Sequence, residues 1–142
     1  MATTQLNVEH LFTLTAELGD STHALIKGGP QGTRTIASVT GGSFTGPKLS
    51  GTIVPPGGDW VSVRADRSIR LDVRLLLVTD DGESILMSYN GIGERAKDGT
   101  MQLRTAPTFE TGAESYAWLN NVQAVGIGNA QPGSVTYEIY AL

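Results

Sequence analysis

Cysteine is absent from the 142 residues of this chain, which excludes disulfides, a thiolate nucleophile and zinc sites built on cysteine ligands. Long hydrophobic runs are also absent, because no segment approaches the roughly 20 apolar residues of a membrane-spanning helix. Residues 1–7 are polar and lack the basic and apolar regions of a secretory signal. We therefore expect a soluble, cytoplasmic protein with no membrane partner.

Positive charge is scarce, with 10 Lys and Arg against 14 Asp and Glu and a formal net charge of -4. The basic residues are scattered along the chain. A nucleic-acid-binding protein needs a clustered excess of Lys and Arg to displace counterions from phosphates. We expect no nucleic-acid partner.

Histidine is limited to His10 and His23, and their spacing matches neither an HxH nor an HExxH metal motif. The acidic stretch from Asp80 to Glu83 lacks the alternating ligands of a calcium loop and indicates a hairpin turn instead. The glycine pairs lack the strand-to-helix context of a phosphate-binding loop. We expect neither a metal nor any other cofactor.

Helix-favouring runs are few, whereas glycine occurs 18 times, a composition typical of short strands and many turns. In residues 9–18, apolar and polar side chains alternate with the period of a half-buried strand. Turn signals lie at residues 55–60 and 80–82, and residues 90–99 form a polar, Gly-rich stretch that predicts a loop. The length fits one all-β domain over residues 1–142. Its predicted strands are residues 9–18, 33–40, 44–54, 60–64, 68–79, 83–89, 100–105, 117–128 and 134–142.

The predicted strand over residues 68–79 favours a small closed or nearly closed antiparallel β-barrel over a sandwich. Its odd-numbered positions from 69 to 77 are all apolar. The opposite face carries Arg70, Asp72 and Arg74 near its start and apolar residues at its end. A barrel lumen with a polar mouth would produce this pattern.

Six motifs in a fixed order resemble an uncharacterised bacterial and fungal family, the domain of unknown function numbered 3237. These motifs are Thr40-Gly-Gly-Ser-Phe-Thr-Gly-Pro47, Gly57-Gly-Asp-Trp60, Leu71-Asp-Val-Arg74, Thr79-Asp-Asp-Gly82, Arg104-Thr-Ala-Pro-Thr-Phe-Glu-Thr-Gly112 and Tyr116-Ala-Trp-Leu-Asn120. The resemblance covers nearly the whole chain. It implies a small antiparallel β-barrel, usually oligomeric, without an established common activity.

The family pattern Arg-Thr-x-Pro-x-Phe-Glu-Thr-Gly is complete in this chain. Its matching positions are Arg104, Thr105, Pro107, Phe109 and Glu110. Many relatives place a bulky or basic residue near residues 88–91, where this chain has Ser-Tyr-Asn-Gly. This departure implies a different substrate.

Asp72 and Arg74 are the first candidates for catalytic residues. They share one strand face at positions i and i+2, which lie about 7 Å apart, so their side chains can pair. One interpretation is an ion pair that closes a barrel end. The other is a general base whose pKa the arginine adjusts while the base acts on a ligand.

Tyr89 and Arg104 complete the predicted catalytic set. Tyr89 follows the alternation of Ile85 and Met87, so its ring can be buried while its hydroxyl donates a hydrogen bond to a developing oxyanion. An amphipathic rim residue is the alternative. Arg104 either binds a substrate anion or pairs with Glu110 to hold the following loop, and we favour the pair because a buried, unpartnered guanidinium is costly.

Substrate contacts are expected from two tryptophans and their neighbours. Trp60 and Trp118 each follow a turn-rich segment and can wall a pocket for a flat or apolar ligand, although core packing is the default role of tryptophan. Asn120 has the same strand parity as Trp118, and Asp59 precedes Trp60 as a further acid. Phe109 is the remaining predicted substrate-binding residue.

Three functions are consistent with these residues. The first is a cofactor-independent enzyme of the isomerase, cyclase or hydro-lyase type that acts on a small apolar carbonyl or aromatic compound in a barrel lumen. The second is a binding barrel without turnover, and the third is a structural oligomer. A homodimer is expected, because residues 134–142 predict a short C-terminal strand with an open edge.

Overall fold

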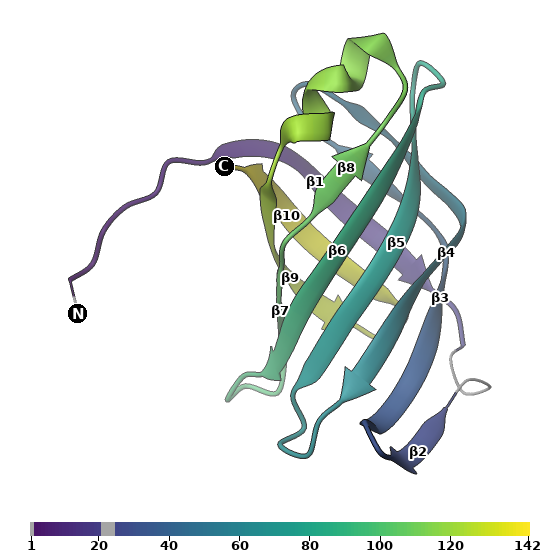
Figure 1. Cartoon of the computed structure of the whole chain (residues 1–142), viewed down its shortest axis with the longest axis vertical. Coiled ribbons are helices and arrows are strands. Elements are labelled where there is room, and N and C mark those ends of the chain that lie inside the picture. The colour runs from purple at the N-terminus through teal and green to yellow at the C-terminus, as the bar shows by residue number, and fades with distance from the viewer. Residues whose placement is uncertain (1, 21–24) are drawn as a thin grey trace.

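The computed structural model describes residues 2–20 and 25–142 and has ten strands and one 3-10 helix, η2 (Figure 1). These elements are β1 (Glu9–Leu18), β2 (Ile26–Gly29), β3 (Gly32–Thr45), β4 (Ser50–Val63), β5 (Ile69–Thr79), β6 (Ser84–Arg95), β7 (Met101–Thr105), β8 (Thr108–Glu110), η2 (Glu114–Asn121), β9 (Ala124–Gln131) and β10 (Ser134–Ala141).

Eight strands close into an antiparallel barrel in the order β1-β10-β9-β7-β6-β5-β4-β3, and β3 pairs back onto β1. The other two strands extend this barrel, with β2 beside β3 and β8 beside β6. Closure pairs both edges of each barrel strand, which leaves few open backbone groups. The predicted all-β barrel is confirmed.

Period-two alternation places apolar side chains in the lumen. In β1, Phe12, Leu14 and Ala16 are buried between more exposed polar residues, as predicted. In β5, the apolar face from residue 69 to residue 77 points inward, while Asp72 and Arg74 lie on the outer surface. The charged face of this strand is therefore the outside of the barrel and not the mouth of its lumen.

Several local predictions were wrong, among them the single strand over residues 44–54, because β3 ends at Thr45 and β4 begins at Ser50. Residues 55–60 do not form a turn, because β4 runs through them with three residues between Val54 and Gly58 where β5 has one between their partners. Proline lacks the N–H that a sheet requires, and this irregular stretch accommodates two prolines within the strand. Residues 90–95 continue β6 as a strand where a loop was predicted. Of the strand predicted over residues 117–128, residues 117–121 belong instead to η2, and β9 begins only at Ala124.

The strand predicted over residues 134–142 is confirmed as β10, but its edges are not open. β10 lies between β1 and β9 and pairs with both. β10 therefore offers no free edge to another chain, because both of its edges are paired.

The two ends of the barrel are filled differently. Beneath η2, Phe12 contacts the rings of Phe44 and Phe109 at centroid distances of 5.5 and 6.0 Å. Figure 1 shows η2 at this end and β2 at the other. Toward the β2 end, small residues such as Ala16, Ala37 and Ala130 point inward and leave space. No helix in the described ranges is both long and apolar enough to cross a membrane.

We predict that Ile139→Ala destabilises the protein by about 2 to 5 kcal/mol, because it leaves a cavity in the packed lumen. Ile139 is 0% exposed. The matched control is Ile127→Ala on the neighbouring strand, which is 50% exposed and should change stability by no more than about 0.5 kcal/mol. Urea unfolding of both variants tests whether Ile139 faces the lumen and Ile127 faces solvent. Equal losses of unfolding free energy in the two variants would contradict this assignment.

Candidate active site

An apolar cavity of about 140 Å³ lies in the lumen toward the β2 end. It is bounded by residues from strands all around the barrel, among them Leu18, Ala37, Val61, Leu71, Leu103 and Val135. Ala37, Val61 and Val135 are only half-buried, so the cavity reaches the surface at this end. For comparison, an apolar cavity of about 150 Å³ can hold benzene.

Asp59 is the carboxyl group that faces this cavity. It stands opposite Ala37 on β3 and Val73 on β5, and Val73 is buried in the lumen. Because side chains directly opposite one another point to the same face of a sheet, Asp59 also points inward. Asp59 was predicted as an acid, although it was predicted to lie in a turn.

The carboxylate of Asp59 also bridges β4 and β5 where regular pairing between these two strands is interrupted. Regular pairing of β4 with β5 stops after Asp59–Val73 and resumes at Ser62–Arg70. Within this break, Oδ1 of Asp59 accepts a hydrogen bond from the backbone N–H of Asp72 at 3.1 Å. The Asp59 carboxylate forms no other hydrogen bond with the described part of the chain, so its second oxygen is available to a ligand.

Burial raises the pKa of Asp59 from 3.8 to about 6. The negative charge of Asp72 raises this pKa further, and the hydrogen bond from the Asp72 backbone opposes the rise. Desolvation of a carboxylate disfavours its charged form. A carboxyl group with a pKa near 6 can accept and return a proton close to neutral pH.

Tyr89 and Tyr137 line the same cavity and form an aromatic pair. Their rings meet edge to face with centroids 5.5 Å apart. Burial raises the pKa of both tyrosines, and the charge of Asp59 raises both further. The Asp59 carboxylate is therefore close enough to both phenols for its charge to affect their pKa values. Both remain protonated near neutral pH and can act as hydrogen-bond donors.

Tyr137 is buried on β10 and lines this cavity, where its protonated hydroxyl can donate a hydrogen bond to a ligand. Tyr137 was not among the predicted site residues, although it shares a strand face with the apolar Ile139 in β10, which indicates an inward position.

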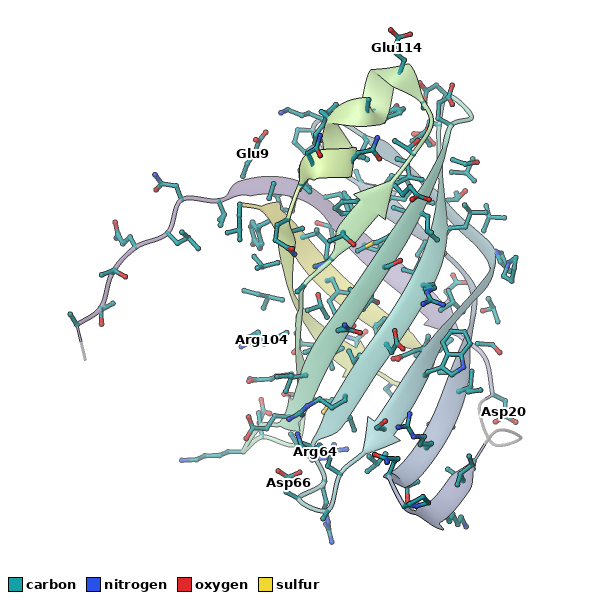
Figure 2. All side chains as sticks on the ribbon, in the orientation of Figure 1. Glu9, Asp20, Arg64, Asp66, Arg104 and Glu114 are labelled. Carbon is teal, nitrogen blue, oxygen red and sulfur yellow. The ribbon has the colours of Figure 1, made fainter. Side chains whose placement is uncertain are left out.

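Three members of the predicted catalytic set lie outside the lumen. Asp72, Arg74 and Arg104 are exposed on the outer wall, and Figure 2 shows Arg104 extending outward from β7. Only Tyr89 of that set lines the cavity. The predicted alternation was correct, but the polar face was assigned to the wrong side of the wall.

The predicted ion pairs do not form among the described residues. Between residues that the structure describes, salt bridges join His10 to Glu138 and Lys48 to Glu9. Arg104 stands opposite Ile92, whereas Glu110 stands opposite Leu86 much farther along β6. Arg104 is exposed, which removes the burial cost that favoured a pair with Glu110.

The remaining predicted substrate contacts are dispersed. Trp60 lies on the outer wall, Phe109 belongs to the packed core beneath η2, and Trp118 on η2 lies under the Lys48 ammonium at 5.2 Å. Asn120 holds the end of η2 to the segment that precedes this helix, because its side-chain amide accepts a hydrogen bond from Thr111 N and donates one to Thr111 O. None of these four borders the lumen cavity.

No cluster of three potential metal ligands occurs in the described ranges. His10 lies on the outer surface, 3.5 Å from the Glu138 carboxylate. His23 lies outside the described residues.

The fold and the site together define a small closed β-barrel with an acid and two phenols in an otherwise apolar cavity. A family model described as a protein of unknown function (DUF3237) matches residues 6–142, and the chain belongs to this family. It is 30% identical to UPF0311 protein RPA1785 of Rhodopseudomonas palustris over 97% of each chain. It is 34% identical to the hydroalkoxylation enzyme phnH of Penicillium herquei, over 84% of this chain and 72% of that one.

Two crystal structures have the same architecture. That of RPA1785 superposes with a TM-score of 0.89 at 28% identity, covering 98% of this chain and 99% of that one. That of an enzyme from Penicillium herquei superposes with a TM-score of 0.75 at 26% identity, covering 100% of both chains.

We predict that Asp59→Asn changes how stability depends on pH. A carboxyl group whose pKa rises on folding contributes stability that is fully present below its unfolded pKa, here 3.8, and is lost as the pH rises through about 6. The asparagine side chain does not ionise, so the variant does not lose stability as the pH rises through about 6. Its free energy of unfolding relative to wild type should therefore be higher at about pH 7.5 than at about pH 4.

Asp66→Asn provides a control with the opposite sign. Hydrogen bonds from the side chain and backbone of Ser68 lower the pKa of Asp66, so its contribution is present at high pH and is lost on acidification. Urea unfolding at both pH values measures the two differences. A pH-independent difference for Asp59→Asn would contradict the raised pKa.

Proposed function

We propose that this protein is a cofactor-independent acid-base enzyme that binds a small, largely apolar, unsaturated carbonyl or aromatic compound in its lumen. The observation that carries the proposal is Asp59, which faces an apolar cavity together with Tyr89 and Tyr137. Apolar pockets with a few convergent polar groups and a displaced pKa are typical of active sites. Asp72, the base predicted from the sequence, is replaced by Asp59 because it faces away from the cavity.

The proposed reaction is the addition of a hydroxyl group across a carbon-carbon double bond conjugated to a carbonyl. Asp59 takes the hydroxyl proton while the oxygen forms a bond to the β-carbon. The electron pair of the double bond moves to the carbonyl oxygen, and Tyr137 donates a hydrogen bond to the resulting enolate. The proton then returns to the α-carbon, so the product is an isomer of the substrate when both groups belong to one molecule.

The name of one relative supports this class of chemistry. The Penicillium herquei protein is called a hydroalkoxylation enzyme, and hydroalkoxylation is the addition of an O–H group across a carbon-carbon double bond. The cavity supports a small substrate, since a volume of about 140 Å³ accommodates a single benzene-sized ring and the remaining atoms of the compound must lie in the open mouth. The mouth at the β2 end gives such a compound a path from solvent.

A binding barrel without turnover is the second candidate, and the largely apolar lining of the cavity favours it. In that case, Asp59 and Tyr137 would orient a ligand that leaves unchanged. Native mass spectrometry of the purified protein can identify a retained compound. Its recovery in altered form after incubation with the protein would separate an enzyme from a carrier.

We predict that the protein accelerates the ring closure of 2′-hydroxycrotonophenone to 2-methylchroman-4-one and forms one enantiomer in excess. Asp59→Asn should lower the accelerated rate by roughly 10²- to 10⁴-fold, the usual contribution of a positioned general base. Wild-type kcat/KM should rise with pH through about 6, as Asp59 loses its proton. Ultraviolet absorbance and chiral chromatography follow the reaction.

Asp72→Asn is the matched control, because it neutralises the outward carboxylate and retains the backbone N–H that binds Asp59. It should preserve the enantiomeric excess and most of the rate. Loss of turnover in Asp72→Asn with full activity in folded Asp59→Asn would return the base assignment to Asp72. Tight binding of this ketone without ring closure would favour the binding barrel.

A further inference from the structure

A second hollow, of about 640 Å³, lies on the outer wall of the barrel across β3 to β7. Most of its side chains lie on the outer face of these strands, and its volume falls within the range of about 300 to 1,000 Å³ that is usual for ligand pockets. We call it the outer groove. The residues that characterise it are Arg34, Trp60, Arg70, Asp72, Asn90 and Arg104.

Strand register aligns three arginines along this groove. Arg34 stands opposite Ser62, Ser62 opposite Arg70, Arg70 opposite Ile92, and Ile92 opposite Arg104. Neighbouring strands are about 4.8 Å apart, so successive arginines begin about 10 Å apart on the wall. The row crosses five adjacent strands, β3 to β7.

The guanidinium groups in this row are available to a ligand. Arg70 and Arg104 each donate one hydrogen bond, to the carbonyl oxygens of Ile69 and Leu103. None of the three arginines forms an ion pair within the described chain. A guanidinium has five N–H donors, so most of them remain for an anion. Asp72 is the single carboxylate in the groove.

Exposed apolar groups lie among these charges. Trp60 is 46% exposed and Ile92 is 51% exposed. Ile92 lies between Arg70 and Arg104 in the arginine row. Trp60 lies two residues before Ser62 on β4 and also lines the groove. An indole offers a flat surface on which an aromatic ring can stack. The groove therefore combines an apolar floor with cationic groups at both sides.

Charge also distinguishes an anionic ligand from a second copy of this chain. The protein carries a net charge of -4, so this row of arginines is a local exception and not a generally basic surface. In a twofold dimer through this face, the same patch meets itself and brings arginine against arginine. Charge complementarity favours an anion.

We infer that the outer groove binds a flat aromatic molecule with a carboxylate at each end. Arg70 and Arg104 hold the two carboxylates through charge-assisted hydrogen bonds, and the ring lies against Ile92 and Trp60. Arg34 extends the positive row on the other side of Arg70. The inference is independent of the proposed chemistry in the lumen.

Isothermal titration calorimetry with naphthalene-2,6-dicarboxylate at low ionic strength tests this site. One molecule should bind per chain, and the neutral dimethyl ester should bind at least about tenfold more weakly, because charge-assisted hydrogen bonds are the strong ones. Arg70→Gln and Arg104→Gln should each weaken binding by about tenfold or more. Added salt should weaken it further by screening these charges.

Arg64→Gln is the matched control, because Arg64 is exposed in the turn between β4 and β5 and lies outside the groove (Figure 2). It should bind the dicarboxylate as tightly as wild type. Equal affinity in all variants, or equal weakening by Arg64→Gln, would overturn the site. Sedimentation equilibrium completes the test, since a change of mass in Arg70→Gln without a change in affinity would make this face a contact between copies and refute the inference.

Discussion

Closure of the sheet through β1 and β3 is the constraint on which the rest of this structure depends. β3 pairs with β4 on one side and with β1 on the other, which turns an open sheet into a barrel. Gly42 permits the close approach, because it has a φ of +137° and a Cβ there would overlap the carbonyl oxygen of Thr15. An irregular step in β3 nearby keeps both Val39 and Phe44 inside, although their spacing would place them on opposite faces of a regular strand.

The closed wall creates two environments from neighbouring residues. Asp59 and Asp72 lie on adjacent strands and are joined by a hydrogen bond, yet Asp59 faces the lumen and Asp72 faces solvent. Burial is the main cause of the raised pKa of Asp59. The acid that suits proton transfer is therefore selected by its side of the wall, because desolvation acts only on the side from which water is largely removed.

Alternation allows the same stretch of wall to supply the lumen cavity and the outer groove. Asp59 borders the cavity, and its neighbour Trp60 borders the groove. Leu71 lies in the lining of both. The two hollows also differ in chemistry, since the cavity holds a carboxyl group and two phenols whereas the groove holds a row of arginines. They suit different ligands.

Local sequence pattern was sufficient for much of this protein. Alternation in residues 9–18 and 68–79, the Asp-Gly turn near residue 82 and the apolar content of β10 determined an all-β chain with correct strands in these regions. The pattern also separated the Asp72 face of β5 from its apolar face. Period two is a property of one strand, so it can be recognised without knowledge of the partners.

Only the tertiary structure decided which face was the inside and which residues met there. Asp59, Tyr89 and Tyr137 come from β4, β6 and β10, and no spacing along the chain relates them. Pairing across the barrel brings them to one cavity, and it sends Arg70 and Arg104 to a common groove on the other side. A strand pattern shows that two faces differ, but the side that loses water depends on how all the strands close around it.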